Sequence, residues 1–206
     1  MEAPMIVRQI EVGWMDNFSY VIGCEKTGKA MVVDPGADVD KILAAAEEAG
    51  LTIETIVNTH GHGDHTAGNA ELKSRTGATV VMHEKDADAH SEVDRRLSGE
   101  ENRLQVGEID FRVIHTPGHT PGGICLYAEG YLFTGDTLFV GDSGRTDLAG
   151  GHRPTLGASI RRLMELPEDT IVCPGHDYGP TPTSTIGWEK RNNVNAKEYG
   201  YFVDGK

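Results

Sequence analysis

Four potential metal ligands crowd into one short turn of this chain, at His60, His62, Asp64 and His65. In an extended backbone, side chains two positions apart point to the same side, so His60 and His62 can bind one ion. Asp64 and His65 follow at the start of a predicted helix and can present a carboxylate and an imidazole to a second ion. Burying such a cluster without a cation would be costly. The run therefore predicts a metal centre.

The elements around this run place it where a strand gives way to a helix. Residues 53–57 form a β-branched apolar run that predicts a strand, and residues 67–75 predict a helix. Similar patterns predict further strands near 5–12, 18–24, 30–33, 78–82, 108–114, 123–128, 131–134 and 170–173, and helices near 38–49, 154–166 and 184–194. This mixed order predicts an α/β fold in which helices cover the sheets.

Three further apolar runs each end in a small-residue turn that is followed by a potential ligand. They are residues 111–119, ending at His119, residues 131–136, ending at Asp136, and residues 171–176, ending at His176. Ligands in α/β folds collect beyond the carboxyl ends of strands. We therefore expect four strand ends to converge on one site.

The converging residues number five histidines and two aspartates, which suits two metal ions. We expect Asp136, with its two carboxylate oxygens, to bridge the ions at the roughly 3.5–4 Å spacing of two-metal sites. The first ion would take His60, His62 and His119, and the second would take Asp64, His65 and His176. The four remaining histidines are interpreted as structural or exposed: His83, His90, His115 and His152.

Length and composition predict a single domain over residues 1–206, with 38% hydrophobic residues. The formal net charge of −13 argues against nucleic acid as a partner. The N-terminus lacks a secretory pattern and no apolar run approaches the roughly 20 residues of a membrane span, so we expect a soluble, cytoplasmic protein with no membrane partner. Three scattered cysteines without a CxxC pair predict reduced, packed thiols.

Two segments lie outside the predicted metal centre, residues 84–102 and residues 195–206. The polar stretch from Glu84 to Asn102 predicts an exposed excursion whose charges serve solvation. The segment from Asn195 to Lys206 carries Tyr199, Tyr201 and Phe202, and it packs either on the body of the protein or on a partner subunit. A homo-oligomer is one of the two expectations.

The ligand motifs, in their order along the chain, resemble the metallo-β-lactamase superfamily. They are His60-Gly-His-Gly-Asp-His65, Gly118-His119, Gly135-Asp136 and Gly175-His176, with Val33-Asp34-Pro35-Gly36 near the start. The resemblance covers essentially the whole chain and implies a four-layer αβ/βα sandwich of two mixed β-sheets flanked by helices. It also implies that Asp34 steadies the ligand loop from behind; otherwise Asp34 only makes the turn before Pro-Gly.

Single positions narrow the resemblance within the superfamily. Asp136 stands where the antibiotic-hydrolysing branch usually has cysteine, and His62 where the diiron flavoprotein relatives carry glutamate. The segment 16–20 is similar to the glyoxalase II-like hydrolases, whose substrates are glutathione thioesters. Segment 143–147 is similar to the sister branch, the persulfide dioxygenases. Both branches stay open.

The resemblance implies a different use of the same residues in each branch. A hydrolase would hold two divalent ions, expected to be zinc, and attack a small anionic thioester with a metal-bound hydroxide that Asp64 orients and deprotonates. A dioxygenase would hold one iron at His60, His119 and Asp136 and oxidise a thiol-derived substrate. We expect the hydrolase. A metal-stabilised binding protein without catalysis is the third alternative.

Two residues outside the ligand set are candidates for substrate binding. Arg145 follows the Asp136 strand, and its guanidinium can form bidentate bonds to a carboxylate; the alternative is a surface salt bridge. Tyr178 can add a hydroxyl contact or simply pack.

Overall fold

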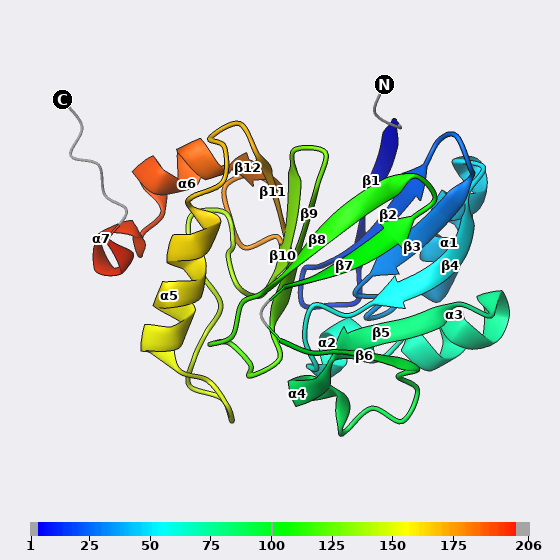
Figure 1. The fold of residues 1–206 in the computed structure, drawn as a ribbon, viewed down its shortest axis with the longest axis horizontal. Helices are drawn as coiled ribbons and strands as arrows, with labels where there is room; N and C mark the ends of the chain where they lie inside the picture. Colours follow the sequence, from blue (N-terminus) through cyan, green and yellow to red (C-terminus); the bar gives the residue numbers. More distant parts are fainter. Residues whose placement is uncertain (1–3, 100, 201–206) are drawn as a thin grey trace.

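Two six-stranded sheets lie face to face in the computed structural model, which describes residues 4–99 and 101–200 (Figure 1). The first sheet has its strands in chain order: β1 (Met5–Val12), β2 (Asn17–Cys24), β3 (Lys29–Val33), β4 (Thr52–Val57), β5 (Thr79–His83) and β6 (Arg95–Leu97). The second has the order β12 (Ser184–Thr185), β11 (Ile171–Pro174), β10 (Tyr131–Gly135), β9 (Ile124–Ala128), β8 (Ile109–His115) and β7 (Glu101–Val106).

Both sheets are mixed. In the first, β1, β2 and β3 pair antiparallel, and β3 to β6 pair parallel. In the second, β7 to β10 pair antiparallel, β11 joins β10 in parallel, and β12 joins β11 antiparallel. The parallel strands β3, β4 and β5 therefore end at one edge, and so do β10 and β11.

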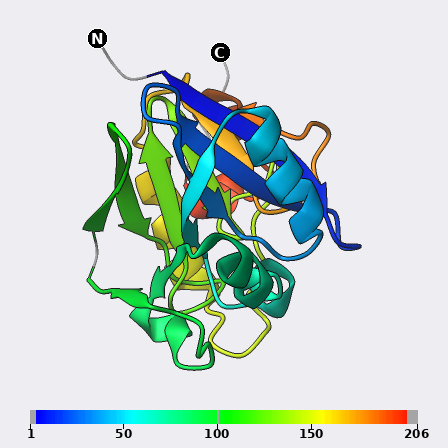
Figure 2. The same cartoon turned by 90° about the vertical axis from the view of Figure 1, so that its right-hand side faces the viewer.

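Helices cover the outer faces of both sheets. On the first sheet lie α1 (Val39–Glu48) and α3 (Asn69–Thr76); Figure 2 shows α1 crossing in front of the strands. On the second sheet lies α5 (Arg153–Leu163). The shorter helices are α2 (Gly63–Thr66), α4 (Glu84–Ala87), α6 (Ile186–Asn192) and α7 (Ala196–Tyr199). The predicted four-layer sandwich is confirmed.

Hydrophobic patterning explains these layers. Every residue of β2 is buried, as expected for a strand with one sheet face toward the other sheet and one toward a helix. Helix α1 buries Val39, Ile42 and Ala46, which share one helical face. Between the sheets, Phe111 and Phe133 are fully buried, so the layers are fixed by apolar contacts made from both sides.

Some predicted elements differ from the structure. The helix expected over 67–75 is α3, and a further short helix that was not predicted, α2, precedes it within the ligand run. The two are separated at Gly68, whose N–H donates to the carbonyl of Pro35 at 2.8 Å. The helix expected over 184–194 begins as strand β12. The stretch from Glu84 to Asn102, predicted as an exposed excursion, holds α4, β6 and the first residues of β7. Short elements of three or four residues give too little periodicity to be detected.

The cysteines and the C-terminal segment are placed as follows. Cys24, Cys125 and Cys173 are buried free thiols, as predicted, and burial raises the pKa of Cys125 to about 11. Tyr199 is buried in the cluster that packs α5 on the second sheet. Tyr201 and Phe202 lie outside the described residues. No helix in the described part of the chain is long and apolar enough to cross a membrane.

Candidate metal centre

All seven predicted ligand residues meet at the strand ends where the two sheets come together. The segment after β4 supplies His60 to His65, and the segments after β8, β10 and β11 supply His119, Asp136 and His176. The contributing strands belong to both sheets, so the site depends on the packing of one sheet against the other.

Three histidine nitrogens form the first donor set. His62 Nδ1 lies 3.0 Å from His60 Nε2 and 3.0 Å from His119 Nε2. The second ring nitrogen of His119 and of His60 has a hydrogen-bond partner outside the donor set. His119 Nδ1 donates to the Arg145 carbonyl at 2.7 Å, and His60 Nδ1 lies 3.1 Å from Thr59 Oγ1. These bonds select the tautomers that turn lone pairs toward the centre of the set.

The second donor set combines a carboxylate with two imidazoles. His65 Nε2 lies 3.1 Å from His176 Nε2, and Asp64 Oδ2 lies 3.4 Å from the first and 3.5 Å from the second. His176 Nδ1 donates to the Met15 carbonyl at 2.8 Å, which fixes its ring. Each set thus presents three donor atoms within 4.8 Å of one another.

Asp136 faces both sets. Its Oδ2 lies 3.4 Å from His119 Nε2 in the first set and 3.4 Å from His176 Nε2 in the second. Its Oδ1 is buried, makes no well-aligned hydrogen bond among the described residues, and lies 3.3 Å from His65 Nε2 of the second set. A buried carboxylate oxygen is costly unless a donor or a cation satisfies it.

The carboxylates of the centre favour positive charge in the second donor set, whereas burial and the neighbouring histidines lower the pKa of His60 and His62 in the first. Burial raises the pKa of Asp136, but His65 and His176 outweigh it and hold that pKa well below its usual range. Burial lowers the pKa of His65, but Asp136 and Asp34 outweigh it and raise that pKa well above the usual value. Five imidazoles and two carboxylates are ligands that suit zinc or iron. The residues present therefore fit a pair of divalent ions.

Asp34 supports the ligand loop from behind and also makes a turn. It accepts hydrogen bonds from Thr59 N at 2.7 Å and Thr59 Oγ1 at 2.6 Å, and His65 Nδ1 donates to it at 3.1 Å. Its own carbonyl accepts from Gly36 N at 2.8 Å. Both sequence-based interpretations of Asp34 therefore describe contacts that the structure contains.

An open cavity of about 500 Å³ leads to the donor atoms, and both candidate substrate residues line it. Tyr178 is half exposed, and its ring stacks on that of His176 with centroids 4.5 Å apart. Arg145 forms a two-pronged ion pair with Asp147, each N–O distance being 2.7 Å, and its side chain is 63% exposed. The guanidinium is thus at the rim, already held by a carboxylate.

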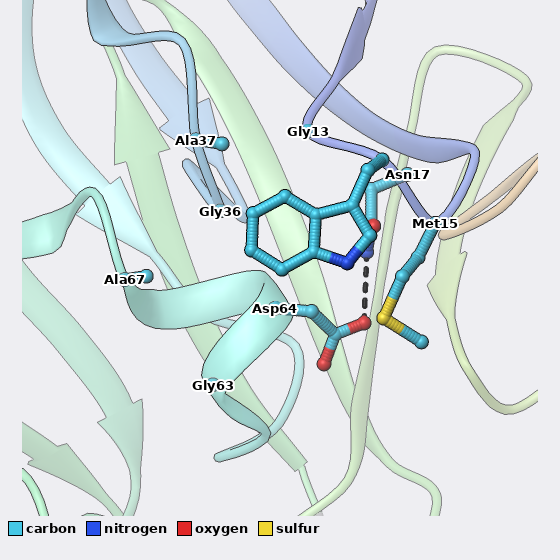
Figure 3. A pocket seen from close by; sticks show the side chains of 9 residues that line it. Gly13, Met15, Asn17, Gly36, Ala37, Gly63, Asp64 and Ala67 are labelled. Atoms are coloured by element: carbon cyan, nitrogen blue, oxygen red, sulfur yellow. Dashed lines mark hydrogen bonds between the residues drawn. The ribbon is translucent and has the colours of Figure 1, made fainter.

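A second, mostly apolar recess of about 330 Å³ adjoins this cavity (Figure 3). Its lining includes Trp14 and Met15 from the β1–β2 turn, and it shares Asp64 with the metal centre. Figure 3 shows Asn17 donating from Nδ2 to Asp64 Oδ2, a distance of 2.9 Å. The polar groups of the recess therefore satisfy each other, and its remaining walls are hydrophobic.

Sequence reasoning missed Asn17 and Asp86 as members of this neighbourhood. Asn17 Nδ2 also lies 3.4 Å from His65 Nε2. Asp86 accepts hydrogen bonds from segments beside His60 and His119. A signal for Asp86 was present, because it follows the end of β5, which runs parallel to β4; the polar composition around it concealed that position.

Removing bound metal is expected to lower thermal stability. An ion present at about a thousand times its dissociation constant stabilises the fold by about 4 kcal/mol, which for a chain of this size is roughly 10 °C. Differential scanning fluorimetry before and after dialysis against a chelator measures the shift, and added zinc should reverse it. An unchanged melting temperature in metal-depleted protein would contradict a bound ion.

The loss in melting temperature on removal of metal should grow from pH 6 to pH 8. The pKa of His65 is higher in the folded protein than in the unfolded chain, where it is near 6.5, so protonation of His65 stabilises the metal-free fold. This stabilisation is fully present below about pH 6.5 and is lost as pH rises toward the pKa of the folded protein. Asp136, with its lowered pKa, stays ionised across this range. Metal binding, which needs deprotonated imidazoles, strengthens over the same interval.

Comparison with known proteins agrees with the geometry. A family model described as the metallo-beta-lactamase superfamily matches residues 12–176. A hydroxyacylglutathione hydrolase of Rhodospirillum rubrum is 42% identical over 182 residues, which are 87% of this chain and 70% of that protein.

Solved structures are also similar. ETHE1 from Myxococcus xanthus has a TM-score of 0.87 at 35% identity, covering 96% of this chain and 88% of that one. TTHA1623 in a di-iron-bound form has a TM-score of 0.79 at 32% identity, covering 91% of this chain and 99% of that one. Both likenesses cover more than nine tenths of this chain.

Proposed function

The chain belongs to the metallo-β-lactamase superfamily of enzymes, and from that premise we propose that it is a two-metal hydrolase of small anionic thioesters. The observation that carries the proposal is the second donor set. Asp64, His65 and His176 are all present and lie around one point, and Asp136 faces both this set and the three histidines. The hydroxyacylglutathione hydrolase among the relatives supports a glutathione-type thioester as the substrate.

In this proposal each residue has a defined role. His60, His62 and His119 would hold one ion, and Asp64, His65 and His176 would hold the other. Asp136, which faces both sets, would be available to each ion. Two divalent ions, which we propose to be zinc, would lower the pKa of bound water toward about 7 and polarise a thioester carbonyl.

The protein's own groups would handle the proton and the leaving group. Asn17 orients the carboxylate of Asp64, whose side chain is 27% exposed and so can accept a proton from the attacking water and pass it to solvent. A thiol of pKa near 8.5 leaves as thiolate with little need for a general acid. No acidic residue beyond Asp64 and Asp136 is required.

The open cavity and the adjoining recess would bind different parts of the substrate. The larger cavity carries Arg145 and the Tyr178 ring, which suit the anionic and polar part of the substrate. The smaller recess, with Trp14 and Met15, suits apolar atoms on the other side of the reacting carbonyl. Its volume of about 330 Å³ exceeds the roughly 150 Å³ cavity that accommodates benzene in an engineered protein.

A one-iron persulfide dioxygenase is the second candidate. The structural likeness to ETHE1, with a TM-score of 0.87, favours it, as does the segment 143–147. His60, His119 and Asp136, the residues such an iron would use, are in place. In that case the second donor set would have no part in the reaction.

Metal analysis of protein purified without added metal, followed by parallel assays, tests the proposal. We expect two ions per chain and release of thiol from glutathione thioesters. One iron per chain, with oxygen uptake on glutathione persulfide and no thioester cleavage, would replace the proposal by the second candidate. Intact folding without metal, and no turnover on either substrate, would favour a binding protein.

We propose that the chain works in the cytoplasm on small molecules. Three buried free thiols fit a reducing compartment. The net charge of −13 disfavours nucleic acid as a partner. Homo-oligomer formation stays a prediction.

Replacing Arg145 by alanine is expected to raise KM roughly tenfold for an anionic thioester with little change in kcat, because the guanidinium contributes binding and no bond making. Lysine at the same position should recover part of the loss, since it keeps the charge but not the two-pronged geometry. Arg153→Ala is the matched control: Arg153 also pairs with a carboxylate, Glu198, but lies outside the cavity. Equal KM values in the Arg145 and Arg153 variants would remove Arg145 from substrate binding.

A further inference from the structure

One carboxylate outside the donor sets joins the two loops that carry the three histidines. Asp86, in the four-residue helix α4, accepts from Gly61 N at 3.0 Å and from Thr120 Oγ1 at 2.6 Å through Oδ2, and from Gly122 N at 2.6 Å through Oδ1. Gly61 lies between His60 and His62, and Thr120 directly follows His119. All three contacts therefore fall on the backbone or side chains of the first donor set's loops.

The local packing shows that these loops are shaped around the carboxylate. A Cβ at Gly122 would lie 2.6 Å from Asp86 Cγ, and a Cβ at Gly61 would lie 3.2 Å from Asp86 Cβ. Glycine at these positions lets the two loops approach the aspartate closely. On the other side of the turn, His90 Nε2 donates to the Gly61 carbonyl at 3.0 Å. The turn between His60 and His62 is thus held at both its N–H and its carbonyl by one segment, residues 86–90.

The contacts of Asp86 and Asp34 fall on different parts of the centre. Asp34 binds His65 directly and reaches His60 only through Thr59. Asp86 has no contact with Asp64, His65 or His176 among its hydrogen bonds in the described residues. Its hydrogen bonds can therefore influence one donor set without the other.

We propose that Asp86 is a positioning residue that sets the geometry, and hence the metal affinity, of the three-histidine set. The inference rests on the proposed use of His60, His62 and His119 as ligands. One carboxylate with three donors fixes the distance between two loops that are far apart in sequence, so that three nitrogens converge. Partners that orient metal ligands typically contribute 10–100-fold in affinity or activity.

Zinc competition with a chromophoric chelator tests this in two backgrounds that each keep a single donor set. In His176→Ala, where the three-histidine set remains whole, Asp86→Ala should weaken zinc binding by roughly 10–100-fold. In His119→Ala, which removes a ligand from the three-histidine set and from the one-iron alternative but leaves the second set whole, the same change should alter affinity by no more than about twofold. Asp86→Asn, which keeps one acceptor oxygen, should lose less than Asp86→Ala in the first background.

Asp88→Asn is the matched control, because Asp88 follows on the same segment and is exposed, and within the part of the chain that the structure describes its carboxylate pairs with Arg96 at the surface. It should leave zinc affinity unchanged in both backgrounds. Equal losses in both backgrounds, or a lower melting temperature with unchanged zinc affinity in both Asp86 variants, would overturn the inference by showing a role in general stability.

The outcome separates this inference from the proposed two-metal function. If the unmodified protein binds only one ion, the two-metal proposal fails. Asp86→Ala should nevertheless lower the affinity for that ion, because His60 and His119 are also ligands in the one-ion alternative. An unchanged affinity for that single ion would overturn the role of Asp86.

Discussion

Asp136→Asn is expected to lower kcat/KM by about a thousandfold or more, a loss of about 4 kcal/mol in transition-state stabilisation. The change keeps the shape of the side chain but removes its negative charge and replaces one oxygen by an amide nitrogen, which cannot bind a cation. Asp136 is the residue that both donor sets face, with Oδ2 3.4 Å from His119 Nε2 and from His176 Nε2. Both ions should therefore bind more weakly.

The measurement is turnover together with metal content after gel filtration. Asp110→Asn provides the control, because Asp110 is an exposed residue of β8, on the strand that leads to the His119 loop, and undergoes the same chemical change. We expect the control to retain wild-type activity and metal content. Near-wild-type turnover in Asp136→Asn would exclude a bridging role, whatever the reaction catalysed.

His176→Ala is expected to separate the two candidate reactions. The substitution removes a nitrogen 3.1 Å from His65 Nε2 and leaves the three-histidine set intact. A two-metal hydrolase should lose roughly a hundredfold or more in thioester hydrolysis, because the second ion would lose one of its four protein ligands and keep only Asp64, His65 and the shared Asp136. A one-iron dioxygenase, which uses His60, His119 and Asp136, should keep oxygen uptake within a few-fold of the unmodified rate.

His152→Ala is the control for that experiment. His152 is exposed at the start of α5, and its side chain contacts Thr155, with Nδ1 2.7 Å from Oγ1, and none of the donor residues. Its backbone N–H donates to the Gly118 carbonyl at 2.7 Å, a bond that alanine keeps. Metal counts should read one ion for His176→Ala and two for His152→Ala. Full hydrolytic activity in a one-ion His176→Ala protein would contradict the two-metal mechanism while leaving the metal centre itself in place.

The sequence predicted best those strands and helices in which apolar residues recur at regular intervals. Strands such as β2 and β8 and the helices α1 and α5 were found because their apolar residues repeat over five or more positions. The short elements α4, β6 and β12 were missed. Their conformation depends on contacts with other elements, such as the pairing of β6 with β5. A local sequence pattern does not reveal such contacts.

The convergence of the seven candidate ligand residues could be expected from the sequence for a different reason. Each of the four ligand segments stands directly after a strand, and strand ends meet where sheets pack. Asp86 follows β5 in the same way, three residues beyond the strand end as His60 is beyond β4, but it lies in a stretch rich in charges. Its role could not be distinguished from that of its exposed neighbours, because a hydrogen bond to Gly122 joins residues 36 positions apart.

The sequence by itself determined which residues this protein brings to the candidate metal centre, their order along the chain and the superfamily to which the chain belongs. Residue type and strand-end position are local properties, and these are what a sequence displays. The tertiary structure decided which nitrogen of each histidine faces the centre, that Asp136 lies against both sets, that Arg145 is already paired with Asp147, and that Asp86 joins two ligand loops. These features depend on distances between residues as far apart as His65 and His176, 111 positions along the chain. Such distances are fixed only when the two sheets pack.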